Sequence, residues 1–158
     1  MKKTHKSAFI NIIGKPNVGK SSLVNFFMGR KISIISSKAQ TTRHRILSIL
    51  NDDNYQLVFS DLPGIITPKN KLHKSMMRFV SGSYSDADII LFVIDSSKDH
   101  FFDNDLVDKI KSLKIPIIIV LNKIDLIDNI ILDQIVEKFG SIFNNEFIFP
   151  ISITNPFN

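Results

Sequence analysis

The chain has 158 residues, 44% of them hydrophobic and 22% charged, with no Cys and no Trp. This length and apolar fraction suit one domain with a substantial core, and the lack of Cys excludes disulfide scaffolds and Cys-based metal sites. No apolar run approaches the ~20 residues that a membrane-spanning helix needs, so we expect a globular cytoplasmic protein. Residues 1–51 carry ten Lys and Arg but no Asp or Glu. This imbalance indicates an anionic partner, although heavy use of Lys, Ile and Asn would also produce it.

Six short segments rich in Ile, Val, Leu and Phe predict β-strands, at residues 9–13, 45–50, 55–59, 88–94, 116–121 and 147–151. Several of these segments are continuously apolar, which is typical of strands buried on both faces of a parallel sheet. Amphipathic stretches between them predict helices, at residues 20–28, 71–81, 104–113 and 129–139. The alternation predicts a three-layer α/β/α domain around a mostly parallel six-stranded sheet.

A phosphate-binding motif follows the first predicted strand and opens the first predicted helix. Residues 14–21 read GKPNVGKS, which fits the P-loop pattern in its required strand–turn–helix context. Backbone N–H groups of such a loop surround phosphate oxygens, the lysine contacts the β- and γ-phosphates, and the hydroxyl that follows binds Mg²⁺. The fold is therefore predicted to be that of a P-loop NTPase. The predicted phosphate-binding residues are Asn17, Val18, Gly19, Lys20, Ser21 and Ser22.

A second motif, NKID at residues 122–125, follows the fifth predicted strand. The P-loop alone leaves ATP and GTP open. The carboxylate of Asp125 can accept hydrogen bonds from N1 and the exocyclic amine of guanine, whereas adenine offers no matching pair of donors. Lys123 can lay its aliphatic stem along the base, and Asn122 can hold the loop. We therefore expect GTP and GDP as substrate and product, bound at the carboxyl edge of the sheet.

Two loops around the predicted phosphate site carry the features of nucleotide-dependent switches. Asp61, at the end of the third strand, can hold Mg²⁺ through water, and the Gly64 N–H can contact the γ-phosphate. Thr41 or Thr42 can complete the Mg²⁺ ligands, and we favour Thr42. Ile65 follows Gly64 and cannot orient a water molecule, so we expect slow hydrolysis. The predicted metal ligands are Ser21, Thr42 and Asp61, and the predicted catalytic residues are Lys20, Thr42 and Gly64.

With these motifs the chain resembles the Era family of bacterial GTPases along essentially its whole length. The discriminating segment is KAQTTRHRI at residues 38–46. The resemblance implies a molecular switch that binds 16S ribosomal RNA, through a C-terminal KH domain, and assists assembly of the small ribosomal subunit. It also implies K⁺ as a further cofactor, with Asn17 as its ligand. Peripheral membrane association and the oligomeric state are left open.

The chain departs from the family pattern in three places. Leu62 stands where the family has Thr. Ser152 and Ile153 occupy the place of a Ser-Ala pair that supports guanine, and we assign both to nucleotide binding although the larger Ile153 can crowd the base. The sequence stops at Asn158, before the last helix of a G domain and the KH domain, so we expect residues 1–158 to be a truncated G domain with one incompletely covered sheet face. A nucleotide-binding remnant without turnover is the alternative function.

A set of basic residues flanks the two switch loops and is a candidate surface for RNA or protein. A solvated basic rim is the other interpretation of the same residues. They are Arg43, His44, Arg45, Lys69, Lys71, Lys74 and Arg78.

Overall fold

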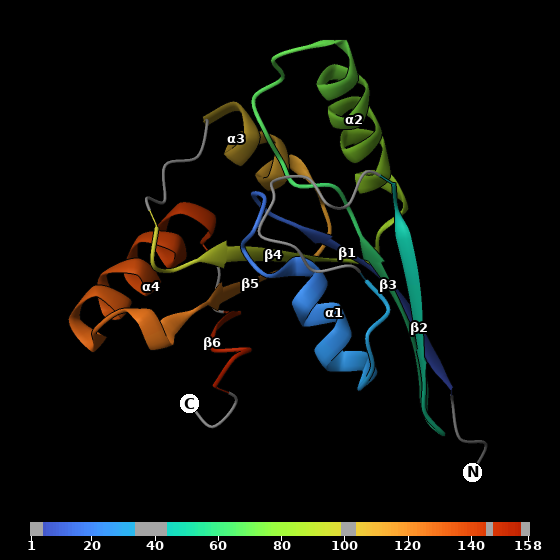
Figure 1. Cartoon of the computed structure of the whole chain (residues 1–158), viewed down its shortest axis with the longest axis horizontal. Coiled ribbons are helices and arrows are strands. Elements are labelled where there is room, and N and C mark those ends of the chain that lie inside the picture. Colours follow the sequence, from blue (N-terminus) through green and yellow to red (C-terminus); the bar gives the residue numbers. More distant parts are fainter. Residues whose placement is uncertain (1–4, 34–43, 99–103, 145–146, 156–158) are drawn as a thin grey trace.

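The computed structural model describes residues 5–33, 44–98, 104–144 and 147–155. These residues form one six-stranded sheet with helices packed on it (Figure 1). The strands are β1 (Lys6–Ile13), β2 (Ile46–Asn51), β3 (Tyr55–Asp61), β4 (Ile89–Asp95), β5 (Ile117–Asn122) and β6 (Ile148–Ile151). The α-helices are α1 (Lys20–Met28), α2 (Lys71–Gly82), α3 (Asn104–Ser112) and α4 (Asn129–Phe143), and two 3₁₀ helices are η1 (Ser83–Asp86) and η2 (Ile124–Leu126).

The strand order is β2-β3-β1-β4-β5-β6. Every neighbouring pair is parallel except β2 and β3, which are antiparallel. Because β1, β3, β4 and β5 run the same way, their carboxyl ends meet at one edge of the sheet, where ligands bind in folds of this kind. The prediction of a mostly parallel α/β sheet is confirmed, with all six strands at the predicted places.

The two faces of the sheet carry separate apolar clusters. On one face, side chains of α2, α3 and α4 pack on the central strands around Phe92, which is fully buried. On the other face, Leu23 and Val24 of α1 pack against Ile12 and Val93. Figure 1 shows α1 on the opposite side of the sheet from α2 and α3. The α1 face thus carries a single described helix.

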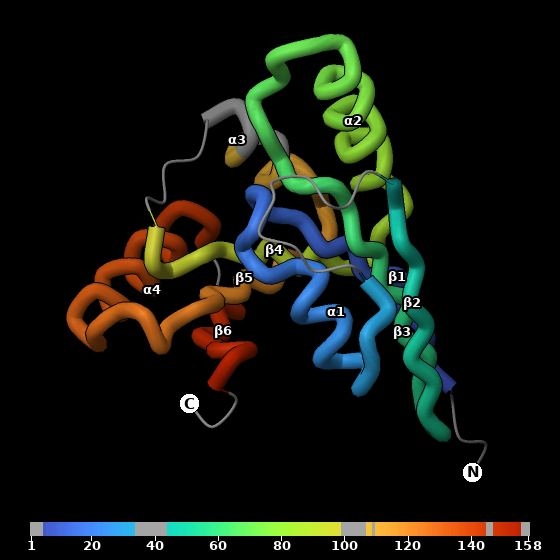
Figure 2. Tube along the Cα trace, viewed as in Figure 1, coloured from blue at the N-terminus to red at the C-terminus, as the bar shows by residue number. Residues whose placement is uncertain are grey.

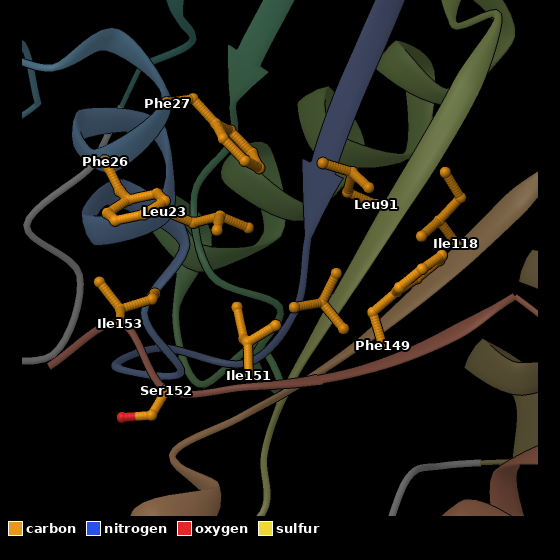
Figure 3. A pocket seen from close by; sticks show the side chains of 10 residues that line it. Leu23, Phe26, Phe27, Leu91, Ile118, Phe149, Ile151, Ser152 and Ile153 are labelled. Atoms are coloured by element: carbon orange, nitrogen blue, oxygen red, sulfur yellow. The ribbon is translucent and has the colours of Figure 1, made fainter. Parts of the chain in front are cut away.

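An apolar groove runs beside α1 over β4, β5 and β6. Its volume is about 350 Å³, and it is lined by α1 side chains such as Phe26 and by sheet side chains such as Phe149, both more than half exposed. Figure 3 shows these side chains facing one another across the groove. Among the described residues, no helix combines the length and apolar character needed to cross a membrane.

The N-terminal end of α1 differs from those of α2 and α4. Asn70 caps α2 by accepting a hydrogen bond from the His73 N–H (2.8 Å), and Asp128 caps α4 through the Ile131 N–H (2.8 Å). The N-cap of α1 is Gly19, which has no side chain to cap it. No side chain at the N-cap therefore stands between the start of α1 and the loop before it, and the positive end of a helix dipole favours an anion there.

Two local features were not predicted. The helices η1 and η2 are single short turns without an apolar period of their own. Helix α4 continues from Phe139, where the prediction ended, through Gly140 to Phe143. Phe143 packs edge-on against Phe92, with ring centroids 5.7 Å apart, so core packing overrides the weak helix propensity of glycine.

Candidate functional site

The loop between β1 and α1 has the backbone geometry of a phosphate cradle. Asn17 and Gly19 have left-handed backbones, with φ of 63° and 105°. A Cβ at Gly19 would also collide with the side-chain amide of Asn122. In Figure 2 this loop lies against the carboxyl ends of β4 and β5. Only glycine combines that backbone with that closeness, which explains the second glycine of the motif.

Lys20 begins α1 and is nearly buried, with 6% of its surface exposed. Its Nζ donates hydrogen bonds to the carbonyl oxygens of Gly14 (3.2 Å) and Lys15 (2.9 Å). Burial lowers the pKa of Lys20 to about 8, and the nearby charge of Asp61 opposes that shift. The ammonium is thus held inside the loop by neutral carbonyl groups, and phosphate oxygens would stabilise its charge.

Ser21 and Asp61 form the second part of the phosphate end. The Ser21 hydroxyl donates to Oδ2 of Asp61 (2.6 Å), and Oδ1 of Asp61 is buried without a hydrogen-bond partner among the described residues. Burial raises the pKa of Asp61, while the hydrogen bond from Ser21 and the charge of Lys20 act against the rise. A hydroxyl beside a carboxylate with an unpartnered oxygen offers the hard oxygen ligands that Mg²⁺ prefers. The residues therefore fit the metal ion that the motif implies.

Gly64 lies directly on the phosphate loop. A Cβ at this position would stand 2.7 Å from the backbone nitrogen of Pro16. The next residue, Ile65, donates its backbone N–H to the carbonyl oxygen of Gly14 (2.9 Å). The segment after β3 is thus fastened to the loop after β1, where a γ-phosphate would lie.

The NKID loop is fastened to the same phosphate loop from the other side. The Asn122 amide donates to the carbonyl oxygen of Val18 (2.8 Å), and Nζ of Lys123 donates to that of Asn17 (3.0 Å). Nζ of Lys123 also forms an ion pair with Oδ2 of Asp95 (2.6 Å). The segments predicted to bind the phosphates and the base are therefore connected by hydrogen bonds.

Asp125 is exposed at the start of the loop after β5, in η2. Its Oδ1 accepts a hydrogen bond from the Ser152 hydroxyl (2.6 Å). This hydrogen bond orients the carboxylate of Asp125 and links it to the segment after β6. Ile153 packs with the apolar cluster of α1 and lines the groove beside that helix, and Figure 3 shows the Ser152 hydroxyl pointing away from the groove.

The structure brings together all but one of the predicted site residues. Ser22 is half-buried in the first turn of α1. Thr42, and with it the choice between Thr41 and Thr42, lies outside the described residues. Arg45, one of the predicted basic surface residues, pairs with Asp86 (2.6 Å).

Sequence reasoning missed Asp95, which contacts Lys123 at the edge of the site. The available signal was an acidic side chain that ends an otherwise apolar strand. Because the carboxyl ends of parallel strands meet, such a residue lies next to the loop after the neighbouring strand.

Comparisons with known proteins agree with this geometry. A family model described as "50S ribosome-binding GTPase" matches residues 9–123. GTPase Era of Staphylococcus epidermidis is 43% identical over 155 residues, which are 98% of this chain and 52% of that protein. The chain therefore spans about half the length of the curated relatives it matches.

Two solved structures add the ligands of related proteins. Era in complex with MgGDPNP and nucleotides 1506–1542 of 16S ribosomal RNA matches with a TM-score of 0.84 and 40% identity, over 96% of this chain and 53% of that one. NFeoB from S. thermophilus, bound to GDP.AlF4- and K+, matches with a TM-score of 0.68 and 25% identity, over 96% and 57%. The fold is that of the P-loop GTPases. With the family model covering most of its length, this chain belongs to the family of 50S ribosome-binding GTPases.

Proposed function

We propose that this chain binds Mg²⁺·GTP and hydrolyses it to GDP and phosphate, with residues 1–158 forming one G domain. The observation that carries the proposal is the joining of Lys20, the Ser21–Asp61 pair and the NKID loop around one cradle. Each part recognises a different portion of the same ligand. The Era structure with MgGDPNP, at 40% identity, supports the same nucleotide and metal ion.

The described residues divide the work as follows. Lys20 and the first N–H groups of α1 bind the phosphates and stabilise the charge that develops on the γ-phosphate during cleavage. Ser21 and Asp61 hold Mg²⁺, which neutralises phosphate charge when it is bound. The Gly64 N–H contacts the γ-phosphate, and Asp125, oriented by Ser152, accepts the two guanine donors.

The attacking water has no side-chain partner at residue 65, because the side chain of isoleucine has no hydrogen-bond donor or acceptor. We propose that Thr42 completes the metal ligands and that Asn17 binds K⁺, which would add positive charge beside the phosphates. The NFeoB structure bound to K+ supports a monovalent cation in a related fold. Hydrolysis should then be slow in Na⁺ and faster in K⁺.

The test measures phosphate release from GTP in Mg²⁺, with K⁺ or Na⁺ as the monovalent cation. The Asp125→Asn variant is assayed with both GTP and XTP, because an asparagine amide can donate to the carbonyl oxygen that xanthine has in place of the guanine amine. We expect GTP turnover by the unaltered chain and XTP turnover by the variant. Phosphate release that ignores the base would contradict the guanine assignment. Nucleotide binding without any turnover would favour the remnant that the sequence analysis kept as an alternative.

We further propose that the chain acts at the ribosome, in the cytoplasm, through contacts with ribosomal RNA. The comparisons support two different partners, because the family description names the 50S subunit whereas the Era structure contains 16S ribosomal RNA. Helix α2 follows Gly64 in the chain and carries three exposed basic side chains, those of Lys71, Lys74 and Arg78. We favour the small subunit because the Era relatives share more of the chain than the family model matches.

Co-sedimentation with purified 30S and 50S subunits separates the two partners. We expect GTP-dependent binding to 30S that weakens steeply with salt, as phosphate contacts do. A Lys71→Glu/Lys74→Glu variant should bind less, and a Lys114→Glu variant serves as a basic-residue control on the loop before β5. Binding to 50S alone would contradict the choice of subunit. Peripheral membrane association, which the sequence leaves open, can be tested by the same assay with lipid vesicles.

A further inference from the structure

Asp95 is a buried acidic residue that the proposed function has not used. It ends β4 and is 4% exposed. Both of its carboxylate oxygens are engaged. Oδ2 pairs with Nζ of Lys123 (2.6 Å), and Oδ1 accepts hydrogen bonds from the Ser97 hydroxyl (2.6 Å) and the Ser97 N–H (3.1 Å). A second cation, Lys98, lies farther away (3.6 Å) and is largely exposed.

The parallel register of β4 and β5 places Asp95 next to Lys123. Asp95 pairs with Asn122 across β4 and β5, and the Ser96 N–H donates to the carbonyl oxygen of Asn122 (2.8 Å). The residue after Asn122 therefore lies beside the end of β4. Ser97 holds the carboxylate of Asp95 through Oδ1, which leaves Oδ2 directed at the ammonium of Lys123.

Lys123 itself has an uncommon backbone, with φ of 66° and ψ of 35°. This left-handed conformation costs free energy for any residue with a side chain, and it persists where surrounding contacts fix it. The ammonium supplies two such contacts, to Asp95 and to the carbonyl oxygen of Asn17 (3.0 Å). A chain of contacts thus runs from β4 through Lys123 to the phosphate loop.

We propose that Asp95 is a positioning residue for guanine nucleotides, acting by holding Lys123 in its base-binding conformation before the nucleotide arrives. This inference rests on the proposed function, since it concerns the same site. A lysine side chain with a solvated ammonium samples many rotamers and loses that freedom on binding. Asp95 fixes the ammonium in the nucleotide-free chain, so the aliphatic stem is already laid out where the base must lie. Preorganisation of this kind increases affinity without any contact between Asp95 and the ligand.

A double-mutant cycle tests the link between the two residues. The unaltered chain, Asp95→Asn, Lys123→Met and the double variant are titrated with a fluorescent GDP analogue in Mg²⁺. Asparagine keeps the shape of Asp95 but removes its charge. We expect Asp95→Asn to weaken GDP binding about tenfold in the unaltered background and less than about twofold in the Lys123→Met background.

Further variants separate positioning from a general loss of structure. Asp86→Asn is the matched control, because Asp86 also forms an ion pair, with Arg45, but at the opposite end of β4. It should leave GDP affinity unchanged. Lys123→Arg keeps the cation and should keep the sensitivity to Asp95→Asn. Circular dichroism reports whether each variant folds. If Asp95→Asn does not fold, Ser97→Ala is used instead, because it removes one hydrogen bond to the carboxylate of Asp95. Its loss of GDP affinity should be smaller but should again depend on the presence of Lys123.

The outcomes are distinct. Equal losses of GDP affinity from Asp95→Asn in both backgrounds would overturn the inference, because a merely structural residue acts whether or not Lys123 is present. The proposed function would survive that result. If the folded, unaltered chain binds no GDP, the proposed function fails and this inference fails with it.

Discussion

The site contains two lysines that meet the rest of the protein in opposite ways. Lys20, at the phosphate end, is nearly buried and its Nζ donates to neutral carbonyl oxygens, so burial lowers its pKa to about 8. Lys123, at the base end, pairs directly with the carboxylate of Asp95 at 2.6 Å. The first lysine holds a charge that the folded chain stabilises poorly, whereas the charge of the second is already compensated.

The difference shows how the site divides recognition from chemistry. At the proposed base end, the contacts of Lys123 with Asp95 and Asn17 hold its ammonium in the nucleotide-free chain, which is the basis of the proposed preorganisation for guanine. At the phosphate end, the poorly stabilised ammonium and the unpartnered oxygen of Asp61 are compensated once phosphate and Mg²⁺ are present. We therefore expect ligand binding to offset the cost of buried charge at the phosphate end and not at the base end. Neutralising each lysine should therefore have opposite effects on the nucleotide-free chain.

Removing the Lys20 charge should give the largest functional effect. Lys20→Met is expected to lower GTP turnover about 100-fold or more, because the variant loses a preorganised charge at the γ-phosphate. Its nucleotide-free form should unfold at a temperature no lower than that of the unaltered chain, since the lowered pKa of Lys20 means that the cost of burying its ammonium outweighs the attraction to Asp61. Phosphate-release kinetics and thermal circular dichroism measure the two quantities. A marked loss of stability would contradict the description of the phosphate end.

Neutralising Lys123 should instead destabilise the nucleotide-free chain. Lys123→Met leaves the buried carboxylate of Asp95 without its cation, and because Lys123 is partly exposed we expect a loss of about 1–2 kcal/mol. That corresponds to a fall of roughly 2–8 °C in the unfolding midpoint. The matched control is Lys98→Met, whose ammonium lies 3.6 Å from the same carboxylate but is largely exposed. Equal effects of the two variants would show that Lys123 is not the principal partner.

Ser152→Ala tests the orientation of the guanine-binding carboxylate. The variant removes the hydrogen bond to Oδ1 of Asp125 and also the acceptor of the Asn155 N–H (3.0 Å). Loss of the bond to Asp125 should weaken GDP binding about fivefold, because one hydrogen bond is worth about 1 kcal/mol. Ser85→Ala is the control, because that hydroxyl donates to the carbonyl oxygen of Gly82 within its own turn. GDP titration of both variants gives the comparison, and an unchanged affinity for Ser152→Ala would leave Asp125 without its proposed support.

The smallest expected effect is the loss of stability contributed by Asp95 at low pH. Burial alone raises the pKa of Asp95, but hydrogen bonds from Lys123 and Ser97, with the charge of Lys123, outweigh burial and lower it below its usual 3.8. A lowered carboxylate pKa adds stability that is present above pH 3.8 and is lost as the pH falls through the folded-state value. The difference in free energy of unfolding between the unaltered chain and Asp95→Asn should therefore be constant from about pH 7 to 5 and shrink below about pH 4. Denaturant unfolding across that range measures it.

The sequence predicted the parts of the site that are local in the chain. The phosphate loop and the NKID segment are short motifs that directly follow apolar strands, so their place at the carboxyl edge of the sheet follows from the strand pattern. The contact between Gly64 and Pro16 and the contact between Asn122 and Val18 join these segments through space. No local pattern contains them, because they depend on the strand order.

The features that could not be predicted from the sequence depend on contacts between residues far apart in the chain. Asp95 reads as the polar end of a strand, and only the register of β4 with β5 places it beside Lys123. Ile153 packs with the α1 cluster, and its Cδ1 would lie 3.4 Å from a Cβ at Gly19. Its effect on guanine stays a prediction. The proposed role of Thr42 stays a prediction.

The most direct test of the account is a titration of the chain with a fluorescent GDP analogue in Mg²⁺ and K⁺, after circular dichroism has shown that it folds. Unlabelled GTP and ATP are then added as competitors. The account predicts tight binding that GTP displaces and ATP does not, because the carboxylate of Asp125 selects the two donors of guanine. Equal displacement by ATP, or a folded chain that binds neither nucleotide, would contradict the central claim that this site recognises guanine nucleotides.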